Sequence, residues 1–245
     1  MPKLMGQADT QVTSSVSGFQ FSAQRIDTLG ASEYTLVCVA SDISGSVGSF
    51  RAELESAYKN VVGSCRKSPR AENILVRGTT FNGGVSELHG YQQLSMIDEN
   101  AISLSCYGNT ALFDASLEAI ESIGGYGKQL RANDYLVNAV IFIITDGDDN
   151  ASKVGSPAKV KKAIEDIKRS ESLESIKVIL IGLGNQTSVQ AYLDTFKNDA
   201  ALDQFVWVGA ADAKALAKMA QFVSASISAS SQSLGTGGPS KNLSI

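Results

Sequence analysis

The stretch Tyr34-Thr-Leu-Val-Cys-Val-Ala40 leads directly into Ser41-Asp-Ile-Ser-Gly-Ser46. Its first seven residues form a near-continuous apolar run rich in β-branched side chains, which is typical of a strand buried on both faces of a parallel sheet. From Ser46 to about Val62, apolar residues recur at helical spacing, and Ser46 is the expected N-cap of that helix. The stretch therefore predicts a central strand, a polar loop and a helix in succession.

Strand and helix patterns continue to alternate along the rest of the chain. Further buried strands are expected over 138–145, 178–181 and 205–208. Further helices are expected from Thr110 to the pair Gly124-Gly125, from Pro157 to about Arg169, over 189–196 and over 212–228. This alternation predicts an α/β fold, with a doubly wound, mostly parallel open sheet and helices on both faces.

Weaker patterns predict strands at the edge of this sheet. Residues 73–81 and 91–97 flank the turn Asn82-Gly83-Gly84 and predict a hairpin, which supplies one antiparallel edge strand. Phe19, Phe21 and Ala23 alternate with polar residues and predict another short edge strand. The segment before about Ser17 shows no pattern typical of a core element.

The chain of 245 residues is long enough for one α/β domain with short extensions. We expect an N-terminal extension over 1–30 that includes the short edge strand, and a folded domain over 31–229. The stretch 230–245 is rich in serine and glycine, which predicts a flexible tail.

Composition excludes several classes of function. The formal net charge is -4, whereas a general nucleic-acid binder needs a basic face, so we expect no nucleic-acid partner.

Cys38, Cys65 and Cys106 are odd in number and lack C-x-x-C spacing, which favours reduced thiols. Cys38 is the expected buried member, and Cys65 and Cys106 have no assigned role. The longest apolar runs have strand length, so neither a signal peptide nor a membrane span is expected. These features favour a cytoplasmic protein.

Five residues with side-chain oxygens follow predicted strands or begin a predicted helix: Asp42, Ser44, Ser46, Thr110 and Asp146. In open α/β sheets the carboxyl ends of the strands form the ligand-binding edge, so loops distant in sequence can converge there. In an extended loop alternate residues point the same way, so Asp42, Ser44 and Ser46 can face one ion. Two carboxylates and three hydroxyls suit Mg²⁺ or Mn²⁺, whereas zinc prefers nitrogen and sulfur ligands.

Three segments together resemble the von Willebrand factor A domain: Asp-Ile-Ser-Gly-Ser (42–46), Gly-Asn-Thr-Ala-Leu-Phe-Asp-Ala (108–115) and Ile-Ile-Thr-Asp-Gly (143–147). The resemblance covers Tyr34 to Ser228. It implies that the five oxygen-bearing residues form a metal-ion-dependent adhesion site (MIDAS). In such sites the serines and the threonine usually bind the metal directly and the aspartates often act through water. A Glu or Asp of a partner protein completes the coordination. Asn109 departs from the family, in which glycine is frequent at this position.

Within the family, the chain is most similar to intracellular bacterial members, because no leader or disulfide pattern is evident. Some bacterial members act beside kinases, phosphatases or AAA-type ATPases, so these systems are candidate partners. The sequence does not identify the partner, the pathway or the oligomeric state.

Simpler interpretations exist for each feature alone. The Asp42–Ser46 cluster or Thr110 could be helix N-caps, and Asp146 could be a turn residue. Asp148, Asp149 and Asn150 are expected in a solvated turn, with support of the ion as the alternative. His89, the sole histidine, is expected on the surface at a turn.

Three functions are compatible with a metal at this edge of the sheet. The first is a magnesium-dependent protein-interaction module without catalysis. The second is a metal-dependent phosphoryl-transfer enzyme. It is disfavoured because Ser44 occupies the position two residues after Asp42 where a phosphatase general acid is expected, and no P-loop is present. The third is a subunit in which the metal only stabilises the fold. We expect no enzymatic activity.

Overall fold

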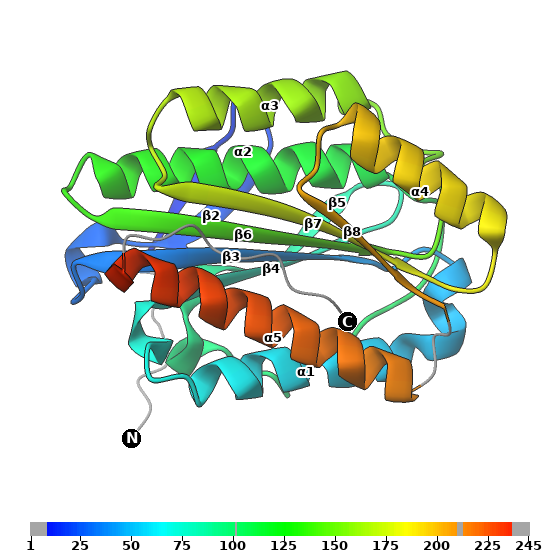
Figure 1. Ribbon diagram of the computed structural model, residues 1–245, viewed down its shortest axis with the longest axis horizontal. Helices are drawn as coiled ribbons and strands as arrows, with labels where there is room; N and C mark the ends of the chain where they lie inside the picture. Colours follow the sequence, from blue (N-terminus) through cyan, green and yellow to red (C-terminus); the bar gives the residue numbers. More distant parts are fainter. Residues whose placement is uncertain (1–8, 101, 210–212, 237–245) are drawn as a thin grey trace.

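The computed structural model describes residues 9–100, 102–209 and 213–236 (Figure 1). The beginning of the expected N-terminal extension, the first residue of the expected last helix and the end of the expected tail lie outside these residues. No helix within the described ranges is both long and apolar enough to cross a membrane.

The described residues form an eight-stranded sheet in the order β1-β2-β5-β4-β3-β6-β7-β8. Neighbouring strands pair in parallel from β4 through β3, β6 and β7 to β8, whereas β5 runs antiparallel to β4 and β1 runs antiparallel to β2. The strands are β1 (Thr10–Ser14), β2 (Gln20–Gln24), β3 (Glu33–Asp42), β4 (Ile74–Phe81), β5 (Val85–Gln93), β6 (Leu136–Thr145), β7 (Ser175–Leu183) and β8 (Gln204–Val208). The predicted mostly parallel α/β sheet is confirmed.

Helices cover both faces of the sheet (Figure 1). On one face lie α2 (Leu112–Arg131), α3 (Pro157–Arg169) and α4 (Thr187–Asp199); on the other lie α1 (Arg51–Arg66) and α5 (Ala213–Thr236). Alternate residues of β3 divide between the two cores: Leu36 and Cys38 pack in the α2 layer, while Val37 and Val39 pack in the α1 layer. A strand that is buried on both faces requires this continuous apolar sequence.

Helix α2 differs from its prediction at the C-terminal end. It does not stop at Gly124-Gly125 but continues to Arg131. A Cβ atom on Gly124 would lie 2.8 Å from Ile167 Cδ1, and one on Gly127 would lie 2.5 Å from Leu173 Cδ2. The glycines therefore permit close packing against α3 and the segment that follows it, and they do not end the helix.

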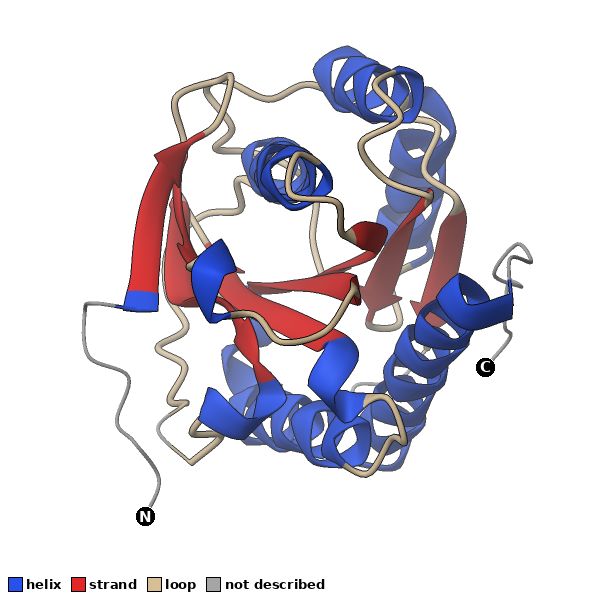
Figure 2. Ribbon diagram, turned by 90° about the vertical axis from the view of Figure 1, so that its left-hand side faces the viewer, coloured by secondary structure: helices blue, strands red, loops and turns tan. Residues whose placement is uncertain are grey.

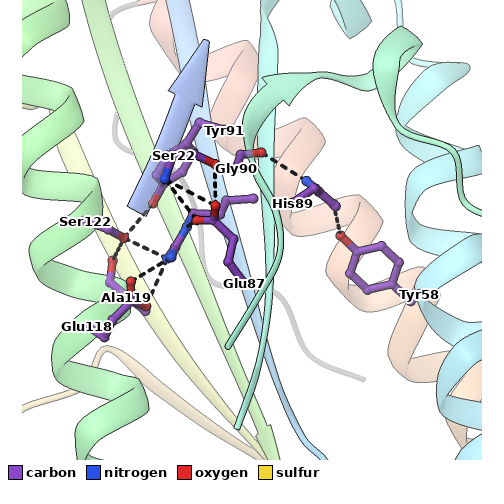
Figure 3. Close-up of polar contacts among 10 residues, drawn as sticks. Ser22, Tyr58, Glu87, His89, Gly90, Tyr91, Glu118, Ala119 and Ser122 are labelled. Atoms are coloured by element: carbon purple, nitrogen blue, oxygen red, sulfur yellow. Dashed lines mark hydrogen bonds and ion pairs between the residues drawn. The ribbon is translucent and has the colours of Figure 1, made fainter. Parts of the chain in front are cut away.

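The predicted hairpin exists, but its second strand was placed too late in the sequence. Strand β5 is Val85–Gln93, and Leu94–Met96 forms a 3₁₀ turn. His89 consequently lies within a strand, and the prediction of a surface turn is wrong. Its Nε2 lies 2.7 Å from the Tyr58 hydroxyl and its Nδ1 lies 3.0 Å from the Gly90 carbonyl oxygen (Figure 3). The error arose because β5 carries many polar residues and lacks a long apolar run.

Strand β1 was not expected, because its side chains show no core pattern. Helix α5 continues to Thr236, beyond the expected end near Ser228, and Ser230 and Ser231 are buried. The Asn138 amide donates to the Ser230 carbonyl oxygen at 3.0 Å, which holds this end of the helix against β6. The first residues of the stretch expected as a tail are therefore helical, and the domain boundaries themselves stay predictions.

A buried ionic cluster joins the N-terminal strands to the core. Arg77 on β4 is 1% exposed and pairs with Glu118 of α2 at 2.7 Å and with Glu87 of β5 at 2.6 Å. Glu87 also accepts hydrogen bonds from the backbone and the hydroxyl of Ser22 on β2 (Figure 3). Because a buried charge left unpaired is costly, this cluster favours one position of β2 beside β5.

We predict that Gly90→Ala destabilises the fold. A Cβ atom on Gly90 would overlap the Ser22 carbonyl oxygen, so β2 and β5 would have to separate. Overpacking of this kind costs about 1–3 kcal/mol, measurable by urea denaturation. Gly83→Ala is the matched control, because a Cβ atom there meets no atom within 4 Å. Equal stability of the two variants would contradict the close approach of β2.

We predict that His89 makes stability fall in mild acid. Burial lowers the pKa of His89 below its ordinary value of 6.5. In mild acid the unfolded chain therefore binds a proton at His89 more readily than the folded protein does. The free energy of unfolding should therefore decrease as the pH falls through the unfolded-state pKa. Urea denaturation at neutral pH and at about pH 5 should show a larger loss for the wild type than for His89→Gln. A titration midpoint of the single histidine NMR signal above 6.5 would contradict this.

Candidate functional site

The site lies where β3 and β6 end side by side. These neighbouring parallel strands are in register up to the pair Ser41 and Ile144. Asp42 is the last residue of β3, and Asp146 directly follows Thr145, the last residue of β6. The register thus places the two carboxylates at the same edge, as predicted for the carboxyl ends of parallel strands.

Hydrogen bonds link four of the five predicted residues. The Asp42 carboxylate accepts the Ser44 backbone N–H at 2.7 Å. The hydroxyl oxygens of Ser44 and Ser46 are 3.1 Å apart, and the Ser46 hydroxyl donates to Asp146 Oδ1 at 2.7 Å. Ser46 was expected to cap a helix; instead, the 3₁₀ turn Ser46–Phe50 that precedes α1 has no side-chain cap, and the Ser46 hydroxyl turns to Asp146.

Thr110 completes the cluster from the segment before α2. It is 4% exposed, and its hydroxyl oxygen would lie 3.8 Å from a Cβ atom on Gly147, the residue after Asp146. Its backbone N–H donates to Asn150 Oδ1 at 2.8 Å, and its carbonyl oxygen accepts the Asn150 N–H at 2.9 Å. Thr110 is not a helix N-cap, since Ala111 occupies that position without a side-chain bond.

The segment before Thr110 is attached to the loop that follows β3. The Tyr107 N–H donates to the Ile43 carbonyl oxygen at 2.8 Å, and the Gly45 N–H donates to the Gly108 carbonyl oxygen at 3.2 Å. Gly108 has a φ of +81°, a conformation that other residues rarely adopt. The two loops therefore hold each other in place, while the Tyr107 side chain stays 65% exposed at the rim of the site.

The electrostatics of the site favour an added cation. Asp42 is 1% exposed, and burial raises its pKa, with the nearby Asp146 charge adding to the effect. Burial also raises the pKa of Asp146. Among the described residues no Lys, Arg or His forms an ion pair with either carboxylate. A buried carboxylate beside a partly buried one, without a positive partner, is unfavourable unless an ion compensates the charge.

The donor set fits a hard divalent cation. Oxygen ligands from two carboxylates and three hydroxyls match Mg²⁺ or Mn²⁺, and water can complete the coordination. Within the described ranges no group of three or more His, Cys, Asp or Glu residues could hold a metal, so a zinc-type cluster is not formed there. The identity of Asp42, Ser44, Ser46, Thr110 and Asp146 as ligands stays a prediction.

The sequence pattern did not predict the residues that orient this cluster: Thr145 had no expected role, and Asp149 and Asn150 were expected in a solvated turn. The Thr145 hydroxyl donates to Asp42 Oδ2 at 2.6 Å, so it fixes the carboxylate that ends the neighbouring strand. Asn150 holds the backbone of Thr110, and Asp149 Oδ1 accepts the Phe113 N–H at 3.1 Å. The stretch after Asp146 is thus more than a solvated turn. It caps α2 from a distant loop, and a local capping pattern cannot reveal such a contact.

The sequence matches no protein-family model and no curated protein. Solved structures do match its fold. The PilB minor pilin from Streptococcus sanguinis aligns with a TM-score of 0.55 and 15% identity, over 91% of this chain and 67% of the pilin. Proximal thread matrix protein 1 from the mussel byssus aligns with a TM-score of 0.54 and 15% identity, over 82% of this chain and 47% of that protein.

A further structure of the byssus protein, described as having a zinc-occupied MIDAS motif, aligns with a TM-score of 0.50 and 16% identity, over 80% of this chain and 46% of that one. This chain spans about half the length of the byssus protein. At these identities the likeness concerns the fold alone. The fold is of the von Willebrand factor A type, as the sequence predicted.

Proposed function

We propose that this chain is a protein-interaction module that binds an acidic residue of a partner through a divalent cation. The observation that carries the proposal is the convergence of two carboxylates, the buried Asp42 and the partly buried Asp146, with three hydroxyls at one edge of the sheet. Among the described residues, neither carboxylate forms an ion pair with a Lys, Arg or His side chain. The byssus protein with a metal-occupied motif of the same name supports the use of a divalent ion on this fold.

The proposed ion is Mg²⁺, with Mn²⁺ as its substitute. Asp42 and Asp146 would supply the negative charge, and Ser44, Ser46 and Thr110 would supply neutral oxygens. Two carboxylates balance a divalent charge without excess, so the bound ion retains affinity for one more anionic ligand. A Glu or Asp of another protein is the proposed occupant of an exchangeable position on the ion.

Tyr107 extends the proposed contact surface beyond the ion. Its backbone is fixed by the bond to Ile43, whereas its ring is exposed. Tyrosine gives a large contact area at a low entropic cost, which is why it is frequent at energetically important positions of interfaces. The proposed partner therefore presents its acidic residue next to a group that packs on an aromatic ring.

A phosphoryl-transfer enzyme is the alternative. That chemistry needs a general acid or base near the metal. Ser44 follows Asp42 at the expected distance along the chain and cannot serve as a carboxylic acid. His89 lies on β5, and its side chain bonds the Tyr58 hydroxyl of α1 rather than a residue of the cluster. We therefore propose a module without catalysis of its own.

Intracellular bacterial proteins with this fold remain the proposed type, in a kinase, phosphatase or AAA-type ATPase system. The support for a cytoplasmic setting is the three free cysteines, of which Cys38 and Cys65 are buried. Free thiols persist in a reducing compartment.

We predict that Mg²⁺ or Mn²⁺ stabilises the wild type and not Asp42→Asn. At a cation concentration of about 100 times the Kd, the gain in unfolding free energy should be about 2.7 kcal/mol. Without cation the variant should be at least as stable as the wild type, since the buried member of two neighbouring carboxylate charges is removed. Calorimetric titration and urea denaturation measure both effects, with the exposed Asp194→Asn as control. Equal cation binding by Asp42→Asn would refute the site.

We predict that partner capture requires both the ion and Thr110. Immobilised protein should retain a partner from the native cell with Mg²⁺ and lose it with a chelator, as detected by mass spectrometry. Thr110→Ala should weaken capture, and so should alanine substitution of the partner's acidic residue. Tyr107→Ala should also weaken capture while calorimetry shows unchanged cation binding.

Two other results would favour the alternatives. Capture that is indifferent to chelator, together with a stabilising metal, would support a purely structural ion. Phosphatase or nucleotidase turnover that disappears in Asp42→Asn would support an enzyme.

A further inference from the structure

Among the described residues, strand β1 pairs with a neighbouring strand on one side of its backbone only. In Figure 2 it is the outermost strand at the left of the sheet, and β2 is its neighbour. The two strands pair without a register shift, from Thr10 opposite Gln24 to Ser14 opposite Gln20. Within the described part of the chain, no other strand pairs with β1.

The hydrogen bonds to β2 determine which residues of β1 point outward. The Arg25 N–H donates to the Asp9 carbonyl oxygen at 2.9 Å, and the Ser15 N–H donates to the Phe19 carbonyl oxygen at 2.7 Å. Backbone groups alternate in direction along a strand of an antiparallel pair, so the odd-numbered residues turn toward β2. The N–H and C=O groups of Thr10, Val12 and Ser14 therefore point away from the sheet.

The side chains show the complementary pattern. Gln11 and Thr13 face α2, because the Gln11 amide bonds Gln129 Oε1 at 2.7 Å and the Gln129 amide bonds Thr13 Oγ1 at 3.4 Å. Val12 points to the opposite face and is 71% exposed. Edge strands that avoid pairing carry charges, proline or bulges, and β1 carries none of these between Thr10 and Ser14.

We propose that β1 pairs with β1 of a second copy of this chain, antiparallel and with Val12 on the two-fold axis. The residues whose backbone groups point away from β2 then pair across the interface: Val12 lies opposite Val12 of the second copy, and Thr10 lies opposite Ser14. This set of three residues is symmetrical, because a residue with a hydroxyl group lies on either side of the valine. A second copy therefore supplies hydroxyl–hydroxyl and β-branched cross-strand pairs, both of which stabilise antiparallel sheets.

The absence of charge on the strand favours this occupant over a generic partner. Two identical charged strands would place like charges opposite each other, whereas Thr10–Ser14 has no charge to repel its copy. The pairing closes on itself, which gives a dimer with one continuous sheet. Because a strand of five residues contributes a small interface, the dimer is a weak one.

Disulfide trapping tests the register directly. In a Cys106→Ser background, where the remaining cysteines Cys38 and Cys65 are buried, Val12→Cys should form a disulfide dimer on mild oxidation. Ser14→Cys alone is the matched control, because its two copies lie four positions apart and should yield about tenfold less dimer. A mixture of Thr10→Cys and Ser14→Cys should crosslink more than either variant alone.

Sedimentation analysis gives the second readout. Wild type and Val12→Thr should show a concentration-dependent dimer, and Val12→Lys, which places like charges on the axis, should remain monomeric with an unchanged circular dichroism spectrum. The dimer should persist in chelator, which separates it from the metal-dependent function. A monomer at every concentration, trapping by Ser14→Cys equal to that by Val12→Cys, or open oligomers built through β8 would each overturn the proposal.

Discussion

The parallel register of β3 with β6 is the constraint from which the candidate site follows. It holds the ends of two buried strands level, so that Asp42 and the Thr145-Asp146 pair share one edge of the sheet. A shift of this register by one residue would move Asp42 away from the Thr145 hydroxyl and would turn the apolar side chains of one strand to the wrong core. The apolar packing of both strands therefore also fixes the geometry of the polar cluster.

The hydrogen bonds that order this polar cluster also hold the Asp42 carboxylate in a buried position, which is electrostatically unfavourable. Thr145, Asn150 and the backbone of Ser44 orient the ligands that we propose, and each does so by a hydrogen bond from a separate segment. Within the described ranges, no Lys, Arg or His side chain forms an ion pair with the Asp42 or Asp146 carboxylate. A divalent ion would relieve this electrostatic cost, and its affinity for a further carboxylate is the basis of the proposed binding function. The Arg77 cluster shows the contrasting solution, in which the chain supplies its own positive charge to Glu87 and Glu118.

The fold of this chain is similar to that of a bacterial minor pilin and of a mussel byssus protein, two proteins from unrelated biological settings. Function must therefore be argued from surfaces of this chain. Two such surfaces lie on different strands: the oxygen cluster at the ends of β3 and β6, and the outer side of β1. The first is proposed to take an acidic side chain, and the second a copy of itself. Because neither surface shares a residue with the other, metal-dependent binding and self-association can be measured separately.

The amino-acid pattern alone was sufficient for the elements whose burial is continuous or periodic. Strand β3, helix α3 with its N-terminal proline, and the candidate ligands at strand ends all follow from local composition and spacing. Features that arise from contacts between distant segments were decided only in the folded chain. Glycines that end many helices instead sit inside α2, because α3 approaches too closely for a side chain. His89 lies in a polar strand that no local pattern distinguishes, and Asn150 reaches back across forty residues to hold Thr110. Such contacts depend on which segments become neighbours in space, and the periodicity of a sequence does not predict which distant segments these are.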